Sequence, residues 1–216
     1  MHFPIFHSII NKIRVELQSR GIEPTNFKEW NDLSINATGL ELVLDVSRYN
    51  TGIKEVVINF DWDSFREVKL AKNLKGMEKH PLIQNSTLMA SRIAPSIDVE
   101  ILWKFDEEFI SGSVKEAVNY SSTDYASAWM NAINEALNSM IPVDKIITRW
   151  HLEIDGNTKN RVVSSMNLIS YVQYSLNNMT DINEIHQLVH TKLASILDMS
   201  AKVLSLAKKT KPIIAA

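Results

Sequence analysis

The chain has 216 residues, of which 45% are hydrophobic and 22% charged, and 23 basic and 25 acidic side chains give it a net charge of −2. A chain of this length forms one domain with a core that needs no disulfide or metal. The near-neutral charge argues against nucleic acid as a partner, since nucleic-acid binders carry a basic stripe. The absence of cysteine excludes disulfides, thiol catalysis and zinc ribbons.

The sequence carries no targeting or membrane signal that we recognise. Its first residues lack the basic region and apolar core of a secretory signal, and no apolar run approaches the ~18–20 residues of a membrane span. We therefore expect a cytoplasmic protein with no membrane partner. No motif for a nucleotide cofactor is present either.

The first predicted element is an amphipathic helix. Pro4 suits its first turn and Gly21 its end. Its apolar residues recur at helical spacing: Phe6, Ile9, Ile10, Ile13 and Leu17. A short helix is predicted next, over 25–33.

Two runs in which apolar residues recur at every second position, 40–47 and 55–62, flank a short turn with Asn50 and Gly52. This pattern predicts a β-hairpin with one buried face. Asp63 is a suitable cap for a helix that continues to about residue 75.

Alternation returns in the second half of the chain and predicts strands over 97–105 and 146–155. A helix is predicted between them, over 123–140. The segment 160–176 is ambiguous, but its length favours a helix. A long C-terminal helix is predicted over 181–209, with Asp181 and Glu184 as a capping pair.

This order of elements predicts the α+β class. We expect a single domain over 1–216, built on a mostly antiparallel sheet of four to five strands with helices on one face and the long C-terminal helix. The apolar side of each strand, which carries the tryptophans, is the side that the helices would cover.

The other side of the sheet is the first candidate site. Ionisable residues would point away from the helices there, among aliphatic neighbours, as in a ligand-binding surface. The alternative is a solvent-exposed face without a binding role, on which cross-strand ion pairs are weak. The residues singled out as ligand-binding are Glu100, Lys104, Arg149, His151 and Glu153.

His186 and His190 form the second candidate. Residues four apart share one face of a helix, so both imidazoles could bind one divalent metal. Gln187 stands where the zinc-hydrolase motif has its catalytic glutamate. The alternative is that both histidines flank the apolar stripe of the helix.

A third pattern is Glu67-Val68-Lys69, which with an upstream Asp45 or Asp61 resembles the acidic arrangement of metal-dependent nucleases. We expect 67–69 to be helical, whereas that chemistry places the tripeptide on a strand. Glu-X-Lys is also common on charged helices.

The C-terminal helix is apolar over a wide arc, so it must be buried on more than one side. It would pack inside the chain or form a homodimer interface. The sequence therefore favours a binding or interaction module, either homo-oligomeric or specific for a small ligand. The alternative is a metal-dependent hydrolase that uses His186 and His190 or the polar sheet face.

Overall fold

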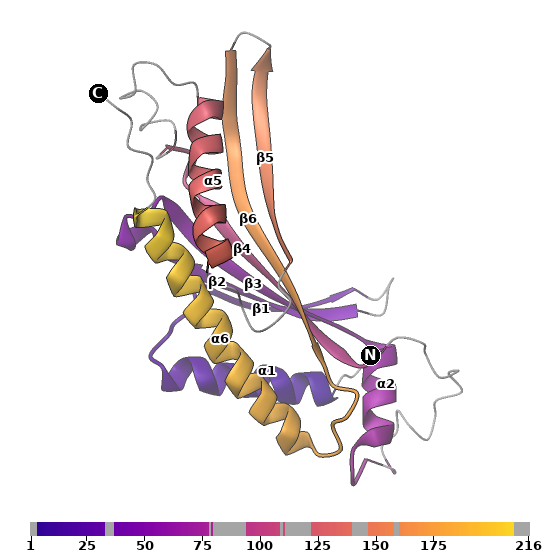
Figure 1. Cartoon of the computed structure of the whole chain (residues 1–216). Coiled ribbons are helices and arrows are strands. Elements are labelled where there is room, and N and C mark those ends of the chain that lie inside the picture. Colours follow the sequence, from indigo (N-terminus) through magenta and orange to yellow (C-terminus); the bar gives the residue numbers. More distant parts are fainter. Residues whose placement is uncertain are drawn as a thin grey trace. The chain divides into compact units, whose positions relative to one another are not determined.

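The computed structural model describes residues 4–32, 37–77, 79, 94–108, 110, 122–139, 147–157 and 160–209. Within these ranges the chain forms an antiparallel sheet of six strands, in the order β1-β2-β3-β4-β6-β5, together with four α-helices (Figure 1). The predicted α+β class is confirmed, with one strand more than the upper end of the predicted number.

The boundaries of the elements follow the chain order shown in Figure 1. They are α1 (Pro4–Ser19), β1 (Asn26–Asp32), β2 (Ala37–Asp45), the 3-10 turn η1 (Ser47–Tyr49), β3 (Ile53–Asp63), α2 (Ser64–Asn73), β4 (Ser96–Phe105), α5 (Ser122–Ser139), β5 (Ile147–Asn157), β6 (Asn160–Ser175) and α6 (Ile182–Lys209).

The chain divides into two compact units. Unit 1 contains residues 1–42, 59–99 and 173–197, and unit 2 contains residues 43–58, 100–172 and 198–216. Unit 1 thus holds α1, β1, α2 and the first part of α6, whereas unit 2 holds α5, β5 and most of β6. The expectation of a single domain stays a prediction.

Unit 1 has a core formed by α1, α6 and the apolar faces of its strands. The predicted stripe of α1 is buried from Phe6 to Leu17, and the Phe6 ring stacks on Trp62 with centroids 5.5 Å apart. The apolar stripe of α6 is buried in the same unit: Ile185, Val189, Leu193 and Ile196. This part of α6 therefore packs within its own chain.

Unit 2 has an aromatic core between α5 and the strands beside it. Phe105 of β4 meets Trp129 of α5 edge to face at 4.9 Å and lies 5.5 Å from the ring of Trp150 on β5. Trp150 Nε1 donates a hydrogen bond to Asn134 Oδ1 of α5 at 2.7 Å. Buried Trp103 and Phe105 thus define the inner face of the sheet in this unit, and buried Trp129 of α5 packs against Phe105.

Several local predictions are confirmed. The hairpin strands are β2 and β3, the strand over 97–105 is β4, and Asp63 caps α2 by accepting a hydrogen bond from Arg66 N at 2.8 Å. At the start of α6, Glu184 Oε2 accepts from Asp181 N at 3.2 Å, and Asp181 Oδ1 accepts from Asn183 N at 2.8 Å.

The preference for a helix over 160–176 is wrong, because this segment is β6. It pairs antiparallel with β5 from Ile147↔Tyr171 to Asn157↔Asn160, with a register shift between Glu153 and Ile154. The shift adds Ser164 as an extra residue on β6. The buried residue before it has an odd number, Val163, whereas the buried residues after it have even numbers, beginning with Met166. That change hides the period of two and imitates helical spacing.

The short helix predicted over 25–33 is also wrong, because this segment is β1. The strand is mostly exposed and polar, so its sequence shows no alternation. Pairing with β2 holds the segment in an extended conformation. Thr38 Oγ1 donates to Trp30 O at 2.7 Å, and Asn26 Nδ2 donates to Glu41 Oε1 at 2.8 Å. A Cβ on Gly39 would lie 2.2 Å from the Trp30 ring, so only glycine leaves room for this indole.

A buried carboxyl group fixes the start of α1. Glu67 of α2 has no exposed surface, and its two oxygens accept from Ile5 N at 2.5 Å, Phe6 N at 3.3 Å and Trp62 Nε1 at 2.6 Å. The first N–H groups of a helix lack partners within the helix, and Glu67 supplies an acceptor from a distant element. Burial nevertheless raises the pKa of Glu67 to about 7.

Glu67 should therefore make stability depend on pH. The folded state holds this proton more tightly than the unfolded chain, so the free energy of unfolding falls as the pH rises from 4.5 to about 7. Glutamine does not titrate. In Glu67→Gln the free energy of unfolding should therefore lack the decrease that Glu67 causes over this pH range, about 3 kcal/mol. Chemical denaturation of both proteins across this pH range measures it, and equal slopes would contradict the assignment.

Candidate functional site

The outer face of the sheet in unit 2, opposite the face that carries Trp103 and Phe105, holds the predicted polar residues. Glu100 and Lys104 alternate along β4 with the buried Ile101 and Trp103. Since neighbouring residues of a strand point to opposite faces, both charged side chains lie on the outer face. On β5, the three residues predicted for this face are all exposed: Arg149, His151 and Glu153.

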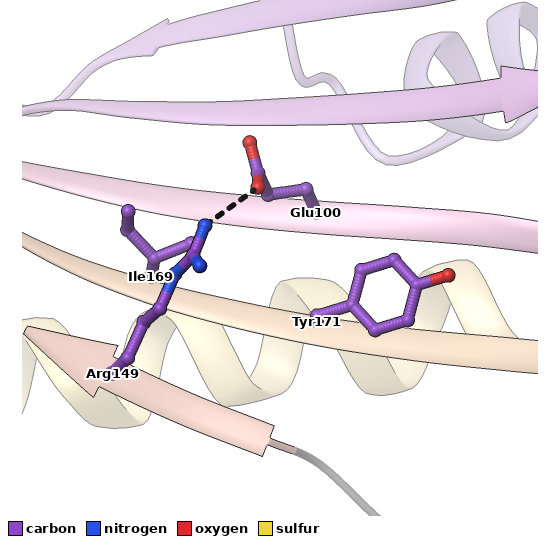
Figure 2. A pocket seen from close by; sticks show the side chains of 4 residues that line it. All are labelled: Glu100, Arg149, Ile169 and Tyr171. Atoms are coloured by element: carbon purple, nitrogen blue, oxygen red, sulfur yellow. Dashed lines mark ion pairs between the residues drawn. The ribbon is translucent and has the colours of Figure 1, made fainter.

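A shallow pocket of about 250 Å³ lies on this face, lined by Glu100, Arg149, Ile169 and Tyr171 (Figure 2). Ile169 and Tyr171 belong to β6, which separates β4 from β5, and Ile169 is the direct partner of Arg149 in the ladder. Figure 2 shows the Arg149 side chain reaching over Ile169 toward Glu100. The pocket is therefore a product of strand order and register.

The charges in this pocket are only loosely paired. Arg149 Nη2 lies 4.0 Å from Glu100 Oε2, which is beyond hydrogen-bond distance, and the Arg149 side chain is 71% exposed. A guanidinium has five N–H donors in a fixed plane. This geometry leaves donors of Arg149 directed to solvent beside an aliphatic side chain and an aromatic ring.

The other predicted residues of the face do not line the pocket. Lys104 Nζ donates a hydrogen bond to Glu55 Oε2 of β3 at 3.2 Å. His151 Nε2 lies 3.6 Å from Glu153 Oε1 on the same strand. Of the five residues chosen from the sequence, the structure thus brings Glu100 and Arg149 together in the pocket and places the remaining three outside it.

Ile169 and Tyr171 are the lining residues that sequence reasoning missed. They lie in the segment interpreted as a helix, where their shared face with Arg149 was hidden. A signal was present, since 166, 168, 170 and 172 are buried and alternate with 165, 167, 169 and 171. That period of two begins only after the extra residue at Ser164.

His186 and His190 lie on one side of α6, as their spacing predicts, and both contact α1 in unit 1. His186 Nε2 is 2.5 Å from Ser8 Oγ, and His190 Nδ1 is 2.7 Å from Glu16 Oε2. Burial, with a smaller effect of the Lys12 charge, lowers the pKa of His186. A shared metal would have to displace both contacts.

No group of three or more His, Cys, Asp or Glu side chains that could hold a metal occurs in the described ranges. The metal site at His186 and His190 stays a prediction. Glu67 of the nuclease-like tripeptide lies in a helix, as expected, and its buried carboxyl group binds the start of α1.

Within the described ranges, no helix is long and apolar enough to cross a membrane. No family model, curated protein or solved structure matches the chain.

Glu16 links α1 to α6, which makes it testable as a stabilising residue. Its carboxylate lies 2.7 Å from both Lys12 Nζ and His190 Nδ1, and hydrogen bonding to Lys12 is the main reason why its pKa is lowered. Glu16→Gln should reduce the free energy of unfolding at neutral pH by about 1 kcal/mol, because the charged contacts are lost.

The sign of the pH effect follows from the lowered pKa. The stabilisation by Glu16 is present above the ordinary value of 4.5 and is lost as the pH falls further. The difference between wild type and Glu16→Gln in urea denaturation should therefore shrink in acid. The matched control is exposed Glu23→Gln, which should stay within about 0.5 kcal/mol of wild type. A constant difference at all pH values would contradict this role.

Proposed function

We propose that the protein is a binding protein and that the pocket on the outer face of β4, β6 and β5 takes a small amphoteric ligand. The observation that supports this most directly is the loosely paired Arg149 beside Tyr171, with a carboxylate 4.0 Å away. Arginine and tyrosine, together with tryptophan, are enriched among the residues that dominate binding energy at protein interfaces.

The size of the pocket favours a small ligand. Drug-sized ligands occupy pockets of ~300–1,000 Å³. The volume of about 250 Å³ lies just below that range. A ligand of amino-acid size therefore fits the pocket better than a nucleotide does.

The charges of the pocket favour a ligand that carries both signs. The Arg149 guanidinium binds a carboxylate through paired N–H donors. A purely anionic ligand would meet the repulsive Glu100 carboxylate, whereas an ammonium group on the same ligand would be attracted to it. Ile169 and Tyr171 offer an apolar surface and a ring for an aromatic group. The ligand class is thus an aromatic amino acid or a close analogue.

The experiment is a titration of the protein with phenylalanine, followed by backbone amide shifts in ¹H–¹⁵N spectra. We expect the shifts to centre on Arg149, Ile169 and Tyr171. Arg149→Met should raise the dissociation constant at least about tenfold, because a charge-assisted contact to the carboxylate is lost. Phenethylamine, which lacks the carboxylate, should bind wild type and Arg149→Met with similar affinity.

The matched control is Lys104→Met, which removes a cation from the same sheet face but outside the pocket. This variant should bind phenylalanine as wild type does. Absence of saturable shifts in the wild type, or equal binding by wild type and Arg149→Met, would exclude the proposal.

A further inference from the structure

β5 lies at one edge of the sheet, where its second side has no partner strand among the described residues (Figure 1). The strand is 11 residues long and contains neither proline nor lysine. Edge strands of monomeric proteins are usually short or carry such residues, because an open edge pairs readily with another strand. β5 has neither proline nor lysine, and its charged residues are Arg149, Glu153 and Asp155.

The outer-face residues of β5 form an ordered row of charges. Arg149 and His151 are followed at the same period by Glu153 and Asp155. The register shift in the β5–β6 ladder places its extra residue on β6, so β5 itself keeps its alternation up to Asp155. The row therefore reads basic, basic, acidic, acidic along one face.

A strand with this row is complementary to itself in the antiparallel direction. A two-fold axis at Leu152 pairs β5 with a second β5 over its whole length, because Leu152 is the central residue of Ile147–Asn157. This register sets Arg149 opposite Asp155 of the second copy and His151 opposite Glu153. Arg149 and Asp155 then carry opposite charges, which stabilises a cross-strand pair, and the His151 imidazole faces a carboxylate that can accept its N–H.

The inner face of β5 is complementary in the same register. Leu152 meets Leu152, and Trp150 meets Ile154. Ile154 is 44% exposed. Pairing with a second copy would bring it against an indole ring, so the register that matches the charges also matches the apolar side chains.

The other edge strand, β1, does not share this property. Full antiparallel overlap of two β1 strands is centred on Glu29 and sets two carboxylates opposite each other. Like charges in that position are destabilising. We propose that the protein forms a homodimer by antiparallel pairing of β5 with β5 of a second copy, which joins the two sheets into one.

The first test is the mass of the protein by sedimentation equilibrium from low micromolar to submillimolar concentration. We expect wild type to reach the mass of two chains. Glu153→Arg/Asp155→Arg and Arg149→Asp/His151→Asp each set like charges opposite each other, so each should weaken dimerisation at least about tenfold. An equimolar mixture of the two variants restores every opposite pair and should recover a two-chain species.

The control is Glu107→Arg, a charge reversal at an exposed residue outside β5, which should dimerise as wild type does. Circular dichroism of each variant confirms that it is folded. Wild type that stays at the mass of one chain, dimers unaffected by either double variant, or a mixture that stays monomeric would each overturn the proposal. Because the readout is mass and not ligand binding, it is independent of the proposed function.

A cross-link tests the register without altering the charges. The chain has no cysteine, so Leu152→Cys introduces one thiol that faces its own copy on the two-fold axis. Directly opposed Cα atoms in an antiparallel pair lie about 4.5–5.5 Å apart, within the range for a disulfide. Oxidation should give a covalent dimer with Leu152→Cys but not with Thr148→Cys, which faces Gly156. Equal cross-linking of both variants, or of neither, would contradict the register.

Discussion

The burial of one face of the sheet is the constraint on which the candidate site depends. In unit 2 the inner face carries Trp103 and Phe105, which are almost fully buried. A shift of one residue in the pairing register of β4 would expose both rings and point the side chains of Glu100 and Lys104 toward the core. Each large aromatic side chain would lose about 2–3 kcal/mol of burial, and each buried charge would cost more. The core therefore fixes the register that brings Glu100, Ile169 and Arg149 into one pocket.

Unit 1 depends on polar contacts as well as on apolar burial. The Glu67 oxygens hold the first N–H groups of α1, and Ser8 and Glu16 further along α1 contact His186 and His190. These contacts join segments that are more than sixty and more than one hundred and seventy residues apart in the chain. The structure thus gives the two histidines a role between helices that their spacing alone does not reveal.

Much of the fold was predictable because alternation is strong where one face is buried and the other solvated. β2, β3, β4 and β5 follow from that pattern, and Asp63, Asp181 and Glu184 mark helix starts. The prediction for β1 was wrong because an exposed edge strand has no apolar period. The prediction for β6 was wrong because one extra residue at Ser164 interrupts its period. The site was accordingly half predicted: Glu100 and Arg149 lie on regular strands, whereas Ile169 and Tyr171 lie beyond the interruption.

Arg149 connects the two proposals, because it lines the pocket and also belongs to the edge strand. In the proposed dimer its guanidinium would lie between Glu100 of its own chain and Asp155 of the second copy. A side chain held by two carboxylates has less rotamer freedom left to lose when a ligand binds. Any gain in ligand affinity from dimerisation must, by linkage, strengthen the dimer by the same factor for each ligand bound. Ligand binding and assembly would then be coupled through one residue.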